Sequence, residues 1–187
     1  MRQFALPLFL TLLLGLTLFA REHIAFGQQL DPDAAPVLPM FPATAEDWIN
    51  GKPVTNADLT GQVTLVHIWA FECWNCYRSF PWLNGLEAEI ADERFGIVGV
   101  HTPEFDREKN RQAVAERARH FQLKHPSMID NDWGYWKALN NRYWPAWYLV
   151  DGSGRIRSLF VGETHAGDPQ ARRIAREIRA LLEESTG

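Results

Sequence analysis

The most constraining feature of the sequence is a closely spaced cysteine pair, Cys73 and Cys76, the only cysteines among 187 residues. Residues 63–70, just before the pair, form a β-branched and aromatic run that is typical of a buried strand. Residues 77–90, just after it, repeat large apolar side chains at helical spacing. A strand, a short turn and a helix therefore place both sulfur atoms at a helix N-terminus. Unpaired backbone N–H groups and the helix dipole stabilise an anion there, and a thiolate is such an anion.

Two cysteines at this spacing can serve as a redox pair, as a structural disulfide or as half of a metal site. A disulfide that closes so short a loop removes little chain entropy from the unfolded state, so stability is a weak reason for it. A tetrahedral zinc site needs four ligands, and the sequence has no second cysteine pair. We therefore expect redox chemistry, in which Cys73 attacks a substrate disulfide and Cys76 resolves the mixed disulfide.

Further motifs occur in order along the chain: Trp69-Ala70, Pro81, His101-Thr102-Pro103-Glu104, Asp130-Asn131-Asp132, Tyr143-Trp144-Pro145-Ala146 and Tyr148-Leu149-Val150-Asp151. Together with the cysteine pair, they resemble the thioredoxin superfamily, and within it the periplasmic TlpA-like and DipZ-like thiol-disulfide oxidoreductases of the redoxin type. The resemblance covers roughly residues 48–163. It implies a thioredoxin-like fold that exchanges a Cys73–Cys76 dithiol or disulfide with protein thiols and disulfides. It also implies an upstream thiol reductant or oxidant, and neither a metal nor an organic cofactor.

The resemblance assigns roles to two residues outside the cysteine pair. Pro145, which follows Trp144, would be a cis-proline that faces the cysteines; a trans proline at the start of a strand is the simpler alternative. His67 stands where thioredoxins hold a buried acid that transfers protons to and from the second cysteine. An unperturbed imidazole could carry out that transfer at neutral pH, and a hydrogen-bonded core histidine is the alternative.

Four residues near the pair are candidates for contact with a substrate protein: Glu72, Trp74, Asn75 and Trp144. Trp74 and Asn75 separate the cysteines, and because neither is cationic we expect a less oxidising pair than one with a histidine there. Trp74 and Trp144 would offer apolar area for docking, unless both belong to the core. Glu72 would oppose a nearby thiolate, or would be solvated and inert. Ser79 stands where TlpA-like proteins often have a glutamate, which leaves the proton route open.

The order of the predicted elements is typical of an α/β fold with a central mixed β-sheet flanked by helices. These elements are strands at 63–70, 95–101 and 125–130, helices at 77–90, 104–123, 133–139 and 169–184, and a hairpin at 146–161. Asn50-Gly51 predicts an additional N-terminal β-hairpin that joins Trp48-Ile49 to Pro53-Val54. Thr102 is expected either to cap the helix that follows it or to contribute, with His101, to the site.

The N-terminal residues 1–27 are expected to be a signal peptide or a membrane anchor, since residues 4–20 are uncharged and follow Arg2. Residues 28–45, rich in proline and alanine, predict a linker, and residues 46–187 the thioredoxin-like domain. We therefore expect a periplasmic or otherwise extracytoplasmic protein, secreted or tethered to the membrane, in a compartment where disulfides persist. The net charge of −4 and the pI near 5.9 argue against a nucleic-acid partner.

Two other functions use the same cysteines. In a peroxide-reducing redoxin, Cys73 would attack a hydroperoxide, but peroxiredoxins usually place a threonine where this chain has Ala70. In a copper chaperone, the two cysteines and a distal histidine such as His101 or His165 would bind Cu(I), which soft thiolates favour.

Overall fold

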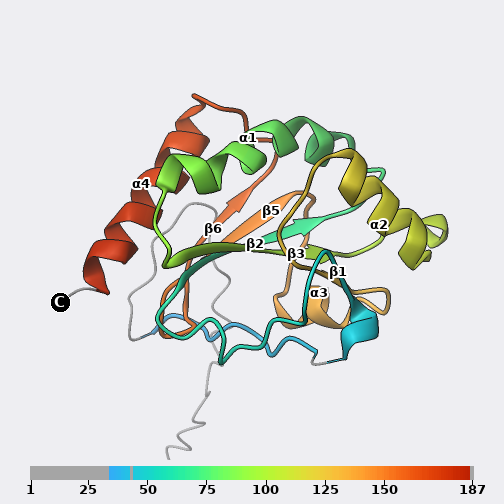
Figure 1. Ribbon diagram of the computed structural model, residues 1–187, viewed down its shortest axis with the longest axis horizontal. Helices are drawn as coiled ribbons and strands as arrows, with labels where there is room; N and C mark the ends of the chain where they lie inside the picture. Colours follow the sequence, from blue (N-terminus) through green and yellow to red (C-terminus); the bar gives the residue numbers. More distant parts are fainter. Residues whose placement is uncertain (1–33, 43, 186–187) are drawn as a thin grey trace, which may run out of the picture.

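The computed structural model describes residues 34–42 and 44–185, and within them one six-stranded sheet has the order β1-β4-β3-β2-β5-β6 (Figure 1). The strands are β1 (Trp48–Ile49), β2 (Val63–Trp69), β3 (Phe95–His101), β4 (Ser127–Ile129), β5 (Ala146–Val150) and β6 (Ile156–Val161). The helices are α1 (Trp74–Ile90), α2 (Arg111–His120), α3 (Gly134–Ala138) and α4 (Pro169–Glu184), with short 3₁₀ helices η1 (Ala45–Asp47) and η2 (Asp106–Lys109). Strands β2, β3 and β4 pair in parallel, whereas β1, β5 and β6 run antiparallel to their neighbours. The predicted mixed sheet with flanking helices is confirmed.

The central strand β2 positions the cysteines, because α1 begins only a few residues after it ends. It pairs in parallel with β3 along its whole length and antiparallel with β5. All of its residues are buried, which explains why its sequence does not alternate between apolar and polar side chains. Leu65 and Trp69 pack on one face of the sheet, and Val66 and Ile68 pack on the other.

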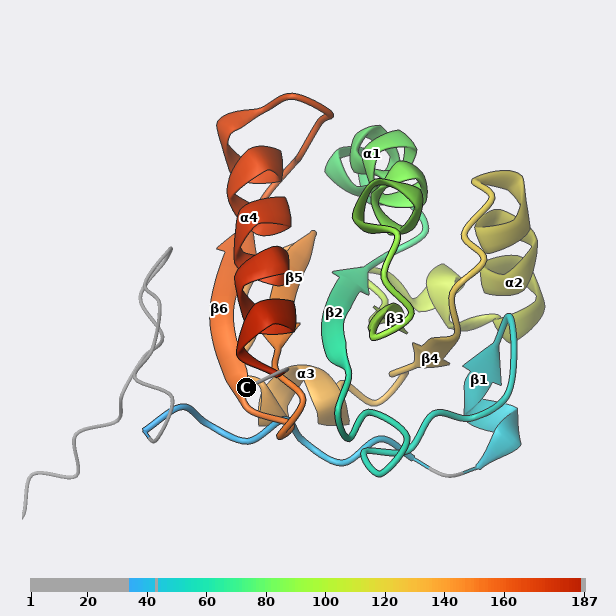
Figure 2. The same ribbon diagram turned by 60° about the vertical axis from the view of Figure 1, so that its left-hand side comes forward.

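Two hydrophobic clusters cover the two faces of the sheet. The first lies beneath α1, α2 and α4, which Figure 2 shows on the same side of the strands. Helix α4 contributes the apolar stripe that its sequence predicts: Ile174, Ile178, Leu181 and Leu182. The second cluster lies against α3 and includes Leu38 and Phe41 of the N-terminal segment. Both faces of the sheet are therefore covered, as its parallel strands β2, β3 and β4 require.

The predicted N-terminal hairpin is wrong. Asn50 and Gly51 do form a turn with positive φ (59° and 144°), but β1 pairs antiparallel with β4 and residues 53–54 are not in a strand. Pro53 has no N–H to donate to a ladder, and the side chain of Asn50 donates to the distant carbonyl of Leu123 (2.8 Å). The local signal thus locates the turn, whereas tertiary contacts choose the strand's partner.

The helix predicted at residues 104–123 is shorter, because α2 begins at Arg111 and η2 occupies part of the run before it. Its N-cap is Asn110, whose side chain accepts a backbone N–H of the first turn (3.0 Å). Thr102 is therefore not the cap. It is buried after the end of β3, and its hydroxyl donates to the carboxylate of Asp130 (3.0 Å).

The described part of the expected linker, residues 34–42, packs against the domain. The Leu38 N–H donates to the carbonyl of Gly154 (2.9 Å), and the carbonyl of Pro36 accepts from Ile156 (2.8 Å). The expected signal peptide or anchor, residues 1–27, lies outside the described residues. Among the helices that the structure describes, none is both long and apolar enough to cross a membrane.

A steric test of the sheet compares two glycines of β3. A Cβ on Gly99 would lie 2.2 Å from Ser127 Oγ and 3.0 Å from Ser127 Cβ, whereas one on Gly96 would meet only the end of Gln62 at 3.8 Å. We expect Gly99→Ala to lower the free energy of unfolding by about 1–3 kcal/mol, because the β3–β4 pair must separate locally. Gly96→Ala should change it by less than about 0.5 kcal/mol in the same urea titration. Equal effects of the two variants would contradict this register.

Candidate active site

The two cysteines form a disulfide at the start of α1, with 5.3 Å between their Cα atoms. Cys73 is the N-cap residue, and its Sγ accepts the backbone N–H of Cys76 at 3.2 Å. Cys73 keeps 6% of its surface exposed and Cys76 none, so the first sulfur is the one nearer to solvent. The predicted placement of the pair at a helix N-terminus is confirmed.

The local electrostatics of this helix start favour a negative charge on Cys73. The first turn of α1 contains no acidic side chain, and the unpaired N–H groups of a helix start point towards its cap residue. The N–H of Cys76 already points at the sulfur of Cys73 in the oxidised protein. A thiolate formed at Cys73 on reduction would therefore meet a hydrogen-bond donor and the positive end of the helix dipole.

The loop between β2 and α1 is held by two buried side chains rather than by a backbone ladder. The N–H of Phe71 donates to His101 Nε2 (3.3 Å), and the N–H of Glu72 donates to Glu108 Oε1 (3.1 Å). The other oxygen of Glu108 accepts the N–H of Glu104 (2.6 Å). Both acceptor side chains are fully buried. The residues that lead into Cys73 are thus tied to the end of β3 and to η2.

His101 remains an acceptor because burial lowers its pKa to about 3. At neutral pH the ring is therefore uncharged, and the N–H···Nε2 bond from Phe71 places the ring proton on Nδ1. The ring lies edge-on to Trp69 (4.8 Å between centroids) and stacks on Phe71 (6.0 Å). His101 Nε2 thus holds the backbone of Phe71 in the loop before Cys73.

Glu72 is neither free in solvent nor aimed at the sulfur atoms. Arg107 Nε donates to both of its carboxylate oxygens (2.8 and 2.7 Å), and Nη2 of the same guanidinium also contacts it. The hydrogen bonds from Arg107 lower the pKa of Glu72, so its carboxylate is charged at neutral pH. Arg107 also lies over the exposed ring of Phe105 (4.3 Å). Glu72 thus belongs to a surface ion pair beside the disulfide.

Ser79 links the first turn of α1 to the loop before α4. Its hydroxyl donates to the carbonyl of Asn75 (2.8 Å) and accepts the N–H of Thr164 (3.0 Å). The serine is fully buried, so it has no water with which to exchange protons directly. Ser79, at the position where TlpA-like proteins often have a glutamate, thus joins α1 to the loop before α4.

The Trp144–Pro145 peptide bond is cis, as the resemblance implies. Trp144 is partly buried: its indole N–H donates to the carbonyl of Thr102 (3.0 Å), and its ring packs on Trp136 (4.0 Å between centroids). Trp74, in contrast, is 68% exposed, and Asn75 beside it is also exposed. The two tryptophans thus present very different amounts of surface, and their contact with a substrate stays a prediction.

His67 is a core histidine whose ring has no hydrogen-bond partner among the described residues. It is fully buried, stacked on Trp147 (4.4 Å between centroids) and edge-on to Phe80 (5.7 Å). Burial lowers its pKa well below the ordinary 6.5, and the nearby His125 lowers it further. The ring is therefore neutral at pH 7. The hydrogen bond expected of a core histidine is absent here, and its proton-transfer role stays a prediction.

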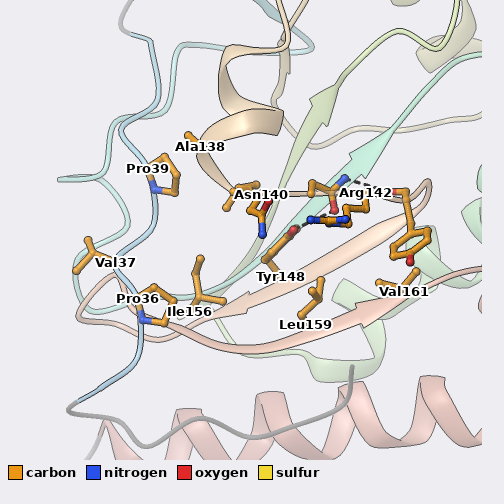
Figure 3. Close-up of a pocket in the computed structure, with 13 residues that line it drawn as sticks. Pro36, Val37, Pro39, Ala138, Asn140, Arg142, Tyr148, Ile156, Leu159 and Val161 are labelled. Atoms are coloured by element: carbon orange, nitrogen blue, oxygen red, sulfur yellow. Dashed lines mark hydrogen bonds between the residues drawn. The ribbon is translucent and has the colours of Figure 1, made fainter. Parts of the chain in front are cut away.

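In the part of the chain that the structure describes, no three or more histidine, cysteine or acidic side chains are grouped so as to hold a metal ion. His101 uses Nε2 to hold Phe71, and His165 is paired with Glu163. A cavity of about 550 Å³ lies between the N-terminal segment and β5–β6 (Figure 3), and none of the cysteine-motif residues lines it. Copper binding by the two cysteines and a distal histidine stays a prediction that this oxidised geometry does not test.

Sequence reasoning did not identify Glu108 as part of the site. It lies among charged residues, Asp106, Arg107 and Lys109, which are typical of a solvated surface. Only the turn of η2 directs its side chain inwards while those neighbours stay exposed. The position of His101 at the end of a predicted strand indicates that it lies near the site, but nothing in the sequence indicates its bond to Phe71.

The buried His67 gives a stability test with a defined sign. Because its folded pKa lies below the ordinary 6.5, the unfolded chain takes up a proton that the folded protein refuses as the pH falls. Stability is therefore lost below about pH 6.5, by at most about 1.4 kcal/mol per pH unit for this group. We expect His67→Phe to show a shallower loss of unfolding free energy between pH 7 and pH 5 in urea titrations. His120→Gln, which removes an exposed histidine, is the control, and identical slopes for wild type and His67→Phe would contradict the assignment.

Comparisons with known proteins agree with this geometry. A thioredoxin-like protein solved in its oxidised form superposes with a TM-score of 0.65, at 27% identity, over 79% of this chain and 97% of the other. Protein DipZ of Mycobacterium tuberculosis (strain CDC 1551 / Oshkosh) is 38% identical over 119 residues, which make up 62% of this chain but 17% of DipZ. Thiol-disulfide oxidoreductase YkuV of Bacillus subtilis (strain 168) is 28% identical over 149 residues, 79% of this chain and 96% of YkuV.

The predicted resemblance and the thioredoxin-like fold are thus confirmed. The cysteine pair, the cis-proline and the mixed sheet all lie within residues 35–175, which match the model of the redoxin family. This chain therefore belongs to the redoxin family.

Proposed function

We propose that the protein is a thiol-disulfide oxidoreductase that exchanges its Cys73–Cys76 pair with the cysteines of partner proteins. The observation that carries the proposal is the pair itself: Cys73 caps α1, forms a disulfide with the fully buried Cys76, and is the one of the two cysteines that retains some exposed surface. Its relative YkuV, which this chain matches over almost its whole length, is a thiol-disulfide oxidoreductase.

The reaction in the reducing direction has two steps. The Cys73 thiolate attacks one sulfur of a partner disulfide; the Cys73–partner bond forms, and the other partner sulfur leaves as a thiolate that takes a proton from water. Cys76, once deprotonated, then attacks Cys73 Sγ and releases the first partner sulfur as the second thiolate. The partner gains two electrons and the pair is oxidised. The reverse sequence would donate the disulfide to a dithiol.

Several side chains around the pair have proposed roles in this exchange. Trp74 and Asn75 are exposed beside Cys73 and would contact the partner first. Trp144 and Pro145 would flank the bound segment, and Glu72, neutralised by Arg107, would leave the thiolate unopposed. His67 would exchange protons with Cys76 only through a rare charged form, given its lowered pKa. The reaction requires no metal or organic cofactor, because sulfur carries both electrons.

We further propose that the exchange takes place outside the cytoplasm. Support comes from the uncharged residues 4–20 after Arg2, which suit an export signal or an anchor. Protease digestion of intact and of permeabilised cells checks this: a domain digested only after permeabilisation of every membrane, the inner one included, would contradict it.

The two cysteines should differ in what their replacement does. Cys73→Ser removes the attacking sulfur, so we expect exchange to fall to the background rate and no adducts to form. Cys76→Ser should accumulate mixed disulfides between Cys73 and partner proteins, visible as adducts on non-reducing gels that disappear with reductant.

The double variant, Cys73→Ser with Cys76→Ser, is the control for adducts formed without either sulfur. If Cys76→Ser collected no adducts under oxidising conditions while Cys73→Ser did, the attacking and resolving roles would have to be exchanged. If neither variant formed adducts or lost activity, the proposed exchange reaction would be wrong.

A further inference from the structure

Glu108 is the buried charged side chain whose contacts lead most directly to the cysteine pair. It lies in η2 with no exposed surface, yet it makes none of the ion pairs that surround it. Its two oxygens are bonded to backbone N–H groups of different segments, Glu72 at 3.1 Å and Glu104 at 2.6 Å. Glu72 is the residue immediately before Cys73. Burying a carboxylate costs free energy even when hydrogen bonds compensate in part, so the burial of Glu108 calls for an explanation.

We propose that Glu108 is a positioning residue of the redox site, which fixes the backbone before Cys73 and thereby holds the attacking sulfur at the start of α1. The inference rests on the proposed exchange reaction. Two converging N–H donors require an acceptor on each side, and among side chains an ionised carboxylate provides this without a donor of its own. A glutamine would turn an NH₂ group towards one of the donors. His101 holds the adjacent N–H of Phe71 in the same manner, so the loop has two side-chain anchors.

The hydrogen bonds that Glu108 accepts from Glu72 and Glu104 should weaken on acidification, because a protonated carboxyl points an O–H at one of the two N–H groups. Burial raises the pKa of Glu108, and the hydrogen bonds from Glu104 and Glu72 oppose that shift only in part. As the pH falls, Glu108 therefore takes up its proton at a higher pH than an ordinary glutamate. The charged and titratable groups that face it or its partners are Glu72, Glu104, Arg107, Tyr77 and Arg117.

The first experiment measures the rate at which the reduced full chain reacts with oxidised glutathione at pH 7. We expect Glu108→Gln to lower this rate at least about tenfold, because Cys73 is no longer held at the helix start. Glu108→Asp keeps the carboxylate on a shorter stem and should recover part of the rate. Asp106→Asn removes an exposed charge from the same turn, and it should stay within about twofold of wild type.

The second experiment uses the oxidised protein, in which the cysteines do not titrate. Hydrogen exchange of the Glu72 amide, followed by NMR, reports directly on the bond to Glu108. We expect its protection to decrease on acidification in the wild type and to be low at every pH in Glu108→Gln. The Leu65 amide in β2 is the internal control, since it should stay protected throughout.

The outcomes separate the possible roles of Glu108. A Glu108→Gln rate equal to or faster than wild type would overturn the proposal, since a purely electrostatic carboxylate slows thiolate formation. A slower rate with wild-type protection at Glu72 would also overturn the proposal, because the loss of rate would then not come from a released backbone before Cys73. If Glu108→Gln does not fold, the wild-type protection of Glu72 decides alone: constant protection down to the pH of unfolding refutes the hold. A wild type that fails to react with oxidised glutathione would instead refute the exchange reaction, while the Glu72 amide still tests the hold.

Discussion

The structure depends on one constraint: a sulfur atom must sit at the N-terminus of α1, at the point where the chain leaves the centre of the sheet. The N-cap position gives Cys73 the N–H of Cys76 and the positive end of the helix dipole. Strand β2, paired on both sides and buried along its whole length, determines where that helix begins. The first hydrophobic cluster packs this helix against this strand.

A tight strand-to-helix connection leaves backbone groups that no regular ladder can satisfy, and buried N–H groups rarely stay unpaired. In this protein His101 and Glu108 accept two of them, and Thr102 and Asp130 link the neighbouring loop. Both acceptors are buried titratable side chains, so their protonation states matter. Burial keeps His101 neutral and makes Glu108 easier to protonate. The backbone before Cys73 is thus held in part by a carboxylate, Glu108, whose raised pKa makes it easier to protonate than an ordinary glutamate.

Much of the fold follows from sequence because its strands and helices have strong local patterns. The apolar run of β2, the stripe of α4 and the cysteines at a helix start were all predictable from periodicity and spacing. Contacts between segments that are distant in the sequence could not be predicted in this way. Asn50 and Gly51 indicated a turn but not that β1 would pair with β4, and nothing in a charged run distinguished Glu108 from its exposed neighbours. His67 lacks the hydrogen bond expected of it because its ring is enclosed by aromatic side chains.

The redox role of the cysteine pair is tested most directly by the reduction potential of the purified protein, measured by equilibration with glutathione and read by tryptophan fluorescence. Trp74, between the cysteines, should make the change visible. We expect a reversible two-electron couple below about −200 mV, since no cation separates the cysteines to favour the reduced form. A value near about −120 mV would make the protein a donor of disulfides and contradict that reading of Trp74 and Asn75. The absence of any reversible couple would mean that Cys73 and Cys76 are not a redox pair.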